Sequence, residues 1–298
     1  MELGRLLTAM VTPFDAEGRL DYEQAQRLAP ALLESGSQGL VVAGTTGESP
    51  TLSRDEKLRL FAAVAEAVKG RGAVLAGTGT YDTAESVELT REAVATGVDG
   101  FLLTVPYYSR PSQEGLRRHF ETIAAATDRP CVMYNIPSRT AVNMTAETTV
   151  ALSRVPNIAG IKEASGDLDQ IARIIDGADE EFRVWSGDDA LTLPIVSIGG
   201  WGAIAVVAHL TGAQMREMIE AHVQGRTEEA AGIHRRLLPL MDTLMKAAGN
   251  PASVKFALNH VGFNVGQPRL PLVAPEGEVA DRIIAELTRH RIDLAVTV

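Results

Sequence analysis

Eight short apolar segments recur along the chain, and they restrict the possible folds more than any other feature of the sequence. Their centres fall near residues 9, 42, 75, 102, 133, 161, 185 and 205. Each segment is rich in Val, Ile and Leu and runs continuously instead of alternating with polar residues, which is typical of strands buried on both faces. The segments therefore predict eight parallel strands that are covered on both sides.

Helical patterns with clear start and stop signals separate these strands. The segment after the second strand opens with Ser53, carries Glu56 three residues later as in a capping box, and stops at Gly70. The next helical segment ends at Gly97 in the same way. Eight strand–helix units over about 225 residues favour an α/β fold, a closed (β/α)8 TIM barrel. An open doubly wound sheet stays possible if one weak strand is miscounted.

The chain changes character after residue 225, where a helical pattern without further strands begins. Four apolar residues share one face of the first helix: Ile233, Leu237, Met241 and Leu244. Pro239 is expected to kink this helix. We expect a (β/α)8 barrel over residues 1–225 and a C-terminal helical domain over residues 226–298.

The composition argues against several classes of protein. A net charge of −10 is unfavourable for nucleic acid as the main partner, because phosphate binding needs a basic surface. The single cysteine, Cys131, permits no intramolecular disulfide, which fits a reducing cytosol. No apolar run approaches the roughly 20 residues that span a bilayer, and the start lacks the basic region of a signal peptide. We therefore expect a cytoplasmic protein without a membrane partner.

Polar residues follow several strands, at the end where (β/α)8 barrels carry their active sites. "GTTGES" follows strand two, "PYYSRPS" strand four and "SGDD" strand seven, while strand five ends at Tyr134 and strand six at Lys162. Only 5 of the 28 basic residues are lysines, so a lysine at the end of an apolar run is unusual here. Burial can deprotonate a lysine but not an arginine, and only a neutral amine is a nucleophile.

Three roles fit Lys162. It could pair with Glu163, although adjacent residues of a strand point to opposite faces. It could anchor a phosphate, but the glycines of "GGWG" precede the eighth strand, which is a poor position for a phosphate loop. It could also be a Schiff-base nucleophile, because burial lowers the pKa of its amine and the phenol of Tyr134 can carry protons.

Other motifs narrow the chemistry further. The amides and hydroxyls of "GTTGE" suit a carboxylate, with an ordinary turn as the alternative, and Arg139 could hold a second carboxylate or simply lie on the surface. The histidines lack metal-ligand spacing, and Asp188 and Asp189 are better interpreted as helix N-caps. Neither G-x-S-x-G nor G-x-G-x-x-G occurs. A lysine-dependent enzyme without cofactor or metal remains.

Together, "GTTGES", "PYYSRPSQEG", "YNIPSRT", "GIKEASGD" and "SGDD" closely resemble the motifs of the dihydrodipicolinate synthases, which belong to the pyruvate-dependent class I aldolases. The resemblance covers essentially the whole chain. "GTTGE" and "GIKEA" mark the superfamily, whereas "PYY-x-RPS" with "PSRT" points to the synthases. The resemblance implies condensation of pyruvate with L-aspartate 4-semialdehyde, in lysine and diaminopimelate biosynthesis, by a homotetramer of two tight dimers.

The resemblance also implies the catalytic residues. Lys162 would form an imine with pyruvate. Tyr134 and Thr45 would relay protons, together with Tyr108 reaching in from the neighbouring subunit.

The same resemblance implies four substrate-binding residues. Thr46 and the turn around it would hold the pyruvate carboxylate, and Arg139 would hold the carboxylate of the semialdehyde. Main-chain groups of Gly187 and Ile204 would line the pocket.

Feedback inhibition is expected to be weak or absent. Relatives inhibited by L-lysine often carry histidines or a glutamate in the helix after "GTTGES" and an asparagine after "GTG". Three residues of this chain differ from that pattern: Arg54, Lys57 and Tyr81. Three others fit it: Ser49, Glu85 and Tyr107.

Two other functions stay open. Pyruvate-dependent aldolases or lyases acting on sugar-derived aldehydes, of the N-acetylneuraminate lyase or 2-keto-3-deoxy sugar acid aldolase type, share the lysine and the tyrosine. Only the arginine of "PSRT" and the paired tyrosines of "PYY" argue for the synthase. A non-catalytic paralogue that binds a keto acid is a remote alternative, because Lys162, Tyr134 and Thr45 are all present.

Overall fold

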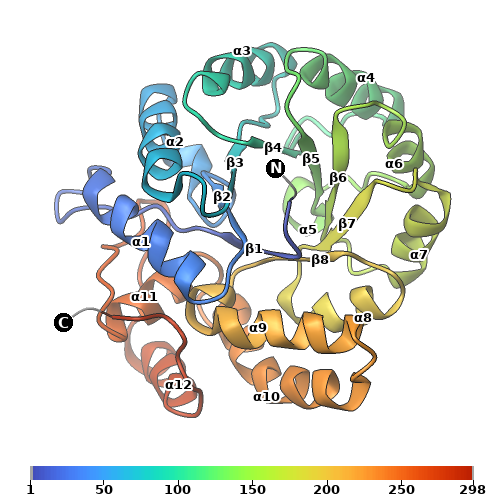
Figure 1. The fold of residues 1–298 in the computed structure, drawn as a ribbon. Coiled ribbons are helices and arrows are strands. Elements are labelled where there is room, and N and C mark those ends of the chain that lie inside the picture. Colours follow the sequence, from blue (N-terminus) through green and yellow to red (C-terminus); the bar gives the residue numbers. More distant parts are fainter. Residues whose placement is uncertain (1–2, 297–298) are drawn as a thin grey trace.

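The computed structural model describes residues 3–296, and its centre is a closed barrel of eight parallel strands. The strands are β1 (Leu6–Ala9), β2 (Gly39–Val42), β3 (Ala73–Gly77), β4 (Gly100–Thr104), β5 (Cys131–Asn135), β6 (Ile158–Glu163), β7 (Arg183–Ser186) and β8 (Gly202–Ala205). Pairing of Leu7 on β1 with Ile204 on β8 closes the barrel. Every predicted apolar segment overlaps one strand, so the predicted TIM barrel is confirmed (Figure 1).

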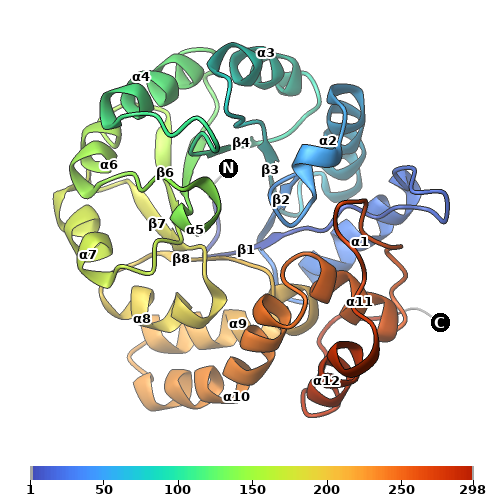
Figure 2. The same cartoon turned by 180° about the vertical axis from the view of Figure 1, so that it is seen from behind.

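Helices form a ring around the strands (Figure 2). They are α1 (Tyr22–Glu34), α2 (Arg54–Val68), α3 (Thr83–Val94), α4 (Gln113–Ala124), α6 (Ala146–Leu152), α7 (Leu168–Gly177), α8 (Thr192–Ser197) and α9 (Ala208–Val223). The capping box of Ser53 and Glu56 is present at the start of α2. Gly70, two residues past the end of α2, has a φ of +74°, a conformation in which glycine is favoured.

Three short helical elements follow β2, β5 and β7, where the sequence predicts only loops. They are η1 (Ser49–Thr51), α5 (Pro137–Thr140) and η2 (Asp189–Leu191). Elements of three or four residues are too short to show helical periodicity, which explains why the sequence does not reveal them. All three lie at the carboxyl ends of the strands, where they shape the candidate site.

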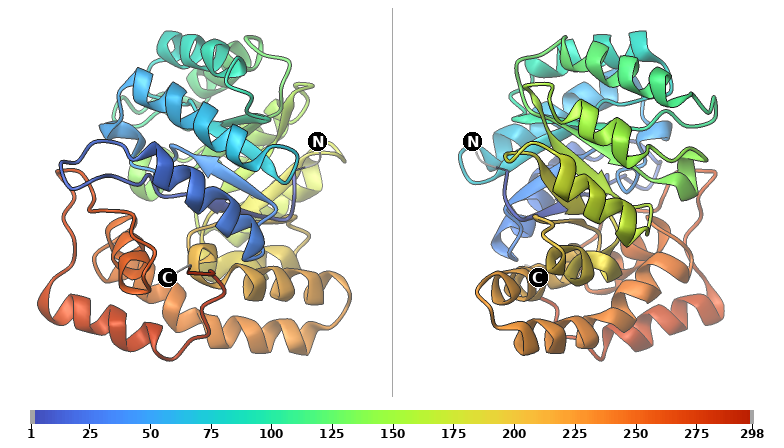
Figure 3. Two further views of the ribbon diagram at one scale, coloured as in Figure 1. Left: turned by 60° about the vertical axis from the view of Figure 1, so that its left-hand side comes forward. Right: turned by 90° about the vertical axis from the view of Figure 1, so that its right-hand side faces the viewer.

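Three further helices pack beside the barrel: α10 (Thr227–Lys246), α11 (Ala252–His260) and α12 (Gly277–Leu287) (Figure 3). All four apolar residues predicted to share one face of α10 are buried. Pro239, which is expected to kink the helix, lies within the span of α10. We retain the division into residues 1–225 and 226–298 as a proposal.

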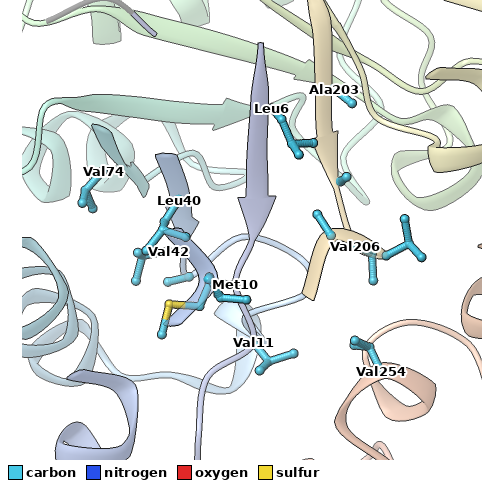
Figure 4. Close-up of a cluster of buried hydrophobic side chains, with 14 of the residues drawn as sticks. Leu6, Met10, Val11, Leu40, Val42, Val74, Ala203, Val206 and Val254 are labelled. Carbon is cyan, nitrogen blue, oxygen red and sulfur yellow. The ribbon is translucent and has the colours of Figure 1, made fainter. Parts of the chain in front are cut away.

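Two apolar layers hold the barrel. One fills its interior and contains Leu7, Val132, Tyr134, Trp185 and Ile204 among others. The other lies between the strands and the surrounding helices, and Val254 of α11 joins it (Figure 4). Within residues 3–296, no helix has both the length and the apolar character that crossing a membrane requires.

Candidate active site

Lys162 and Tyr134 lie side by side inside the barrel. The register of β5 and β6 pairs the two residues, and the Lys162 Nζ atom is 4.4 Å from the centroid of the Tyr134 ring. The exposed fraction is 4% for Lys162 and 3% for Tyr134. Burial lowers the pKa of Lys162 to about 8, against an opposing effect of Asp189, because the charged amine loses its water. About a tenth of this amine is therefore neutral at pH 7, far more than for an exposed lysine, and this neutral form can act as a nucleophile.

The phenol of Tyr134 stays protonated over the same pH range. Burial raises the pKa of Tyr134 well above its usual range, although the charge of Arg139 and a hydrogen bond with the Thr45 side chain act in the opposite direction. A protonated phenol next to a neutral amine can donate a proton to a reacting group and later take it back. Thr45 extends this contact toward the open side of the site.

Glu163 points away from Lys162, as alternation along a strand requires. Its carboxylate accepts hydrogen bonds from the Asn135 side chain at 3.1 and 3.2 Å and from the Ser165 amide at 2.6 Å. No ion pair joins Glu163 to Lys162 among the described residues. The structural ion-pair role considered for Lys162 is therefore wrong.

The turn Gly44–Glu48 after β2 is compact and tightly packed. A Cβ atom added at Gly47 would lie 2.9 Å from the Ala43 Cα, so only glycine fits there. The Thr12 hydroxyl donates to the Gly47 carbonyl at 2.6 Å. The Thr46 hydroxyl accepts a hydrogen bond from the Asn250 side chain at 2.9 Å and keeps its own hydrogen for a further acceptor.

A cavity of about 330 Å³ opens next to this turn. Thr45, Tyr107, Arg139 and Asn250 are among its lining residues. Arg139 lies on α5 and is exposed, and its guanidinium donates to the Asn250 carbonyl at 3.0 Å. Of the eight predicted site residues, only Thr45 and Arg139 line the cavity itself, and Thr45 connects it to Tyr134.

Three of the remaining predicted residues differ in their surroundings. Gly187 lies against Lys162, because a Cβ atom there would lie 3.0 Å from the Lys162 Cε. Ile204 is buried in the barrel interior. Tyr108 is 93% exposed with a φ of +70°, and it does not line the cavity of its own chain. Its neighbour Tyr107 packs edge-on against Tyr81, with ring centroids 5.3 Å apart.

A model of the dihydrodipicolinate synthetase family matches residues 2–290. The chain belongs to the dihydrodipicolinate synthetase family. The 4-hydroxy-tetrahydrodipicolinate synthase of Dehalococcoides mccartyi (strain CBDB1) is 54% identical over 295 residues, which is 99% of each chain. As a member of this family, the chain is an enzyme of the lyase class.

Solved structures of dihydrodipicolinate synthases superpose on the whole chain. The enzyme from Cyanidioschyzon merolae, solved with lysine bound, is 44% identical with a TM-score of 0.95, covering 96% of this chain and 98% of the other. The chloride-inhibited enzyme from Acinetobacter baumannii, solved in complex with pyruvate, is 33% identical with a TM-score of 0.92, covering 97% and 99%. The family fold therefore extends over the helices that follow the barrel.

Two residues near the site of this dihydrodipicolinate synthetase family member make contacts that the sequence does not predict, and the first is Asp189. Asp188 caps η2 as predicted, accepting from the Ala190 amide at 2.9 Å. The cap interpretation is wrong for Asp189, which accepts from the amides of Val206 and Val207 instead. Burial raises the pKa of Asp189 to about 6. The only signal is the doubled aspartate, since one residue suffices as a cap.

Asn250 is the second residue that the sequence analysis misses. It lies 204 positions from Thr46 in the chain. Its side-chain oxygen is buried without a hydrogen-bond partner. Its side-chain NH2 group donates to the Thr46 hydroxyl, and its main-chain carbonyl accepts from Arg139. No local pattern around "GNPAS" indicates such a role.

The described residues contain no group of three or more His, Cys, Asp or Glu side chains that could hold a metal ion. The buried His209 serves the fold instead. Its Nε2 atom accepts from the Val11 amide at 3.1 Å, and its Nδ1 atom contacts the Val206 carbonyl at 2.8 Å.

Proposed function

We propose that the chain condenses pyruvate with L-aspartate 4-semialdehyde through an imine on Lys162, the reaction of a 4-hydroxy-tetrahydrodipicolinate synthase. The observation that carries this proposal is a buried lysine of lowered pKa beside the Tyr134 phenol, at the end of a barrel strand. The full-length similarity to enzymes of that name supports the choice of reaction. The pyruvate complex of a relative supports the choice of the keto acid.

Imine formation uses the residues inside the barrel. The neutral Lys162 amine adds to the C2 carbonyl of pyruvate and gives up its two protons. The carbonyl oxygen takes up two protons and leaves as water. Tyr134 and Thr45 pass the protons that this exchange requires. Thr46 and the amides of the Gly44–Glu48 turn hold the pyruvate carboxylate, because inward amides bind an anion without adding a buried charge.

The carbon–carbon bond forms from the enamine. Loss of a C3 proton from the imine gives a nucleophilic carbon, which attacks the aldehyde carbon of the semialdehyde. Arg139 at the cavity mouth binds the carboxylate of the semialdehyde, since its planar fork matches that group. The amine of the new adduct then attacks C2 and displaces Lys162, which restores the enzyme. The main chain at Gly187 and Ile204 borders the reacting atoms.

Association is part of the proposal. A tyrosine that is 93% exposed and held at a positive φ is costly for an isolated chain, and a neighbouring subunit that accepts Tyr108 into its site would explain it. We propose a homotetramer made of two tight dimers, in which Tyr108 joins the proton relay of the partner.

Turnover assays with alternative substrates test the function. The chain is assayed with pyruvate and L-aspartate 4-semialdehyde, and in parallel with N-acetylmannosamine and with 2-keto-3-deoxygluconate. We expect fast turnover with the semialdehyde alone. In an Arg139→Met variant, we expect a higher KM for the semialdehyde and an unchanged KM for pyruvate. Arg173→Met is the matched control, because Arg173 lies exposed on α7.

Two outcomes would reject parts of the proposal. Preference for a sugar-derived substrate would keep the imine on Lys162 but refute the acceptor. Incubation with pyruvate and borohydride, followed by mass spectrometry, must place the adduct on Lys162. A chain that forms no adduct would have no imine mechanism.

A further inference from the structure

Residues after the barrel form hydrogen bonds with the turn that carries Thr45 and Thr46. Both oxygens of the Glu48 carboxylate are bound by these residues: the Lys255 Nζ donates to Oε1 at 2.9 Å and the Arg269 amide donates to Oε2 at 2.8 Å. The side chains of Glu48 and Lys255 are both fully buried. This ion pair joins residues 207 positions apart.

Glu48 needs such support because of its backbone. Its φ of 56° and ψ of 35° place it in the left-handed region, which a residue with a Cβ rarely adopts. Residues in such conformations persist only where their surroundings hold them, and they concentrate at functional sites. Local backbone preference alone therefore does not explain the conformation of the turn, and contacts with other segments must stabilise it.

Lys255 has no role in the proposed chemistry. It lies on α11, its Nζ also donates to the Gln267 carbonyl at 3.1 Å, and it is 4.1 Å from the centroid of the Phe14 ring. A buried ion pair often adds little stability compared with apolar residues of similar volume, because both charges lose their water. Stability is thus a weak reason for this pair, and a role in fixing one conformation is the better explanation.

The neighbouring contacts act on the same turn. Asn250, which precedes α11, donates to the Thr46 hydroxyl, and the Arg269 side chain binds the Thr51 carbonyl and the Glu56 carboxylate just beyond the turn. α11 itself is anchored to the barrel, since Val254 belongs to the apolar cluster around β1 and β2 (Figure 4). The helix that carries Lys255 is therefore packed against the barrel.

We propose that the Glu48–Lys255 pair is a positioning device for catalysis. It fixes the Gly44–Glu48 turn so that the Thr45 hydroxyl stays on Tyr134 and the amides of the turn face the pyruvate carboxylate. The helices after the barrel are then part of the active site through this pair. The inference rests on the proposed function, because it assumes that pyruvate binds at the turn.

Three variants test the pair: Lys255→Met, Glu48→Gln and the double variant. Lys255→Met leaves a buried carboxylate unpaired, so its Tm falls, and kcat/KM for pyruvate falls about 10- to 100-fold, since a displacement of about 1 Å can cost that much. The double variant contains no unpaired charge, so most of the Tm returns. We expect its kcat/KM for pyruvate to stay about 10-fold or more below wild type, because neutral groups hold the turn less firmly. The KM of the semialdehyde, which depends on Arg139, stays unchanged.

A matched control separates position from stability. Leu237→Ala opens a cavity under α10 and lowers the Tm, but Leu237 is an apolar residue that makes no hydrogen bond or ion pair with the turn. We therefore expect kcat/KM well below the Tm to stay at the wild-type value. If the double variant regains wild-type kcat/KM together with its Tm, the pair is merely structural and the proposal is overturned. The same holds if the single variants lose Tm but keep wild-type kcat/KM. If Lys255→Met does not fold, Glu48→Gln and the double variant still show whether the pair positions the turn or only stabilises the fold.

Borohydride trapping of pyruvate gives a second readout that needs no acceptor. The rate of adduct formation on Lys162 is expected to fall in all three variants but not in Leu237→Ala. A wild-type chain that traps pyruvate but does not turn over the semialdehyde would refute only the proposed acceptor, and the trapping rates would still test the pair. A wild-type chain that never traps pyruvate would refute the proposed function and this inference together.

Discussion

A Gly187→Ala substitution would crowd the side chain of Lys162, the proposed nucleophile. The new Cβ atom would lie 3.0 Å from the Lys162 Cε, 3.1 Å from the Lys162 Cγ and 2.9 Å from the Ala164 Cβ. Ordinary contacts begin near 3.4 Å, so the lysine must move by a few tenths of an ångström. Gly187 has no left-handed φ, and its N–H can still donate a hydrogen bond to the Glu163 carbonyl at 2.7 Å, so the main-chain groups remain in place.

The size of the effect follows from these distances. Crowding a packed interior with one methyl group costs about 1–3 kcal/mol of unfolding free energy. A shift of the amine by up to about 1 Å costs up to about 100-fold in rate, because the attack on pyruvate depends on alignment. We therefore expect Gly187→Ala to fold, to melt a few degrees lower, and to form the imine about 10- to 100-fold more slowly.

The assay compares borohydride trapping rates and kcat/KM for pyruvate in Gly187→Ala and wild type. Gly232→Ala is the matched control: it makes the same change on α10, where an added Cβ atom meets nothing within 4 Å. We expect that control to retain activity and to be slightly more stable, since alanine favours a helix over glycine. A Gly187→Ala variant that traps pyruvate at the wild-type rate would refute the idea that glycine is required to make room for Lys162.

Three further predictions concern the proton relay, the amine and regulation. Tyr134→Phe should keep the fold but lower kcat about 10²- to 10⁴-fold, because the phenol that works with Thr45 is lost; a variant within a factor of three of wild type would contradict the relay. Since burial lowers the pKa of Lys162 to about 8, kcat/KM for pyruvate should fall about tenfold per pH unit below that pH; a limb near 10.5 would show an unperturbed amine. L-lysine should inhibit weakly or not at all, because Lys57 is buried with its own charge attracted by Glu85; half-inhibition well below millimolar L-lysine would show otherwise.

Lysine usage shows how sequence and structure connect. The chain fills its surface with arginine, and three of its five lysines are buried: Lys57, Lys162 and Lys255. The scarcity of lysine therefore indicates special positions. It does not separate the nucleophile from a lysine that pairs with Glu48, because both lie in apolar surroundings and both have a pKa lowered by burial to about 8.

The sequence by itself determined the barrel and the end at which its chemistry lies. Continuous apolar strands, the cap at Ser53 and the residues that follow each strand are local patterns, and their effects act over a few neighbouring residues. Parallel strands that close into a barrel bring all their carboxyl ends to one rim, so Lys162 and Tyr134 could be placed together before any contact was known.

The tertiary structure alone decided how the turn that carries Thr45 and Thr46 is held. Asn250 reaches Thr46 and Lys255 reaches Glu48 across more than 200 residues, and each bond depends on how the last helices pack against the barrel. Asp189 likewise binds the amides of Val206 and Val207 on the strand–helix connection beside it instead of capping its own helix. Such contacts, and the burial that lowers the pKa of Lys162, arise only when distant segments exclude water together, so no local pattern encodes them.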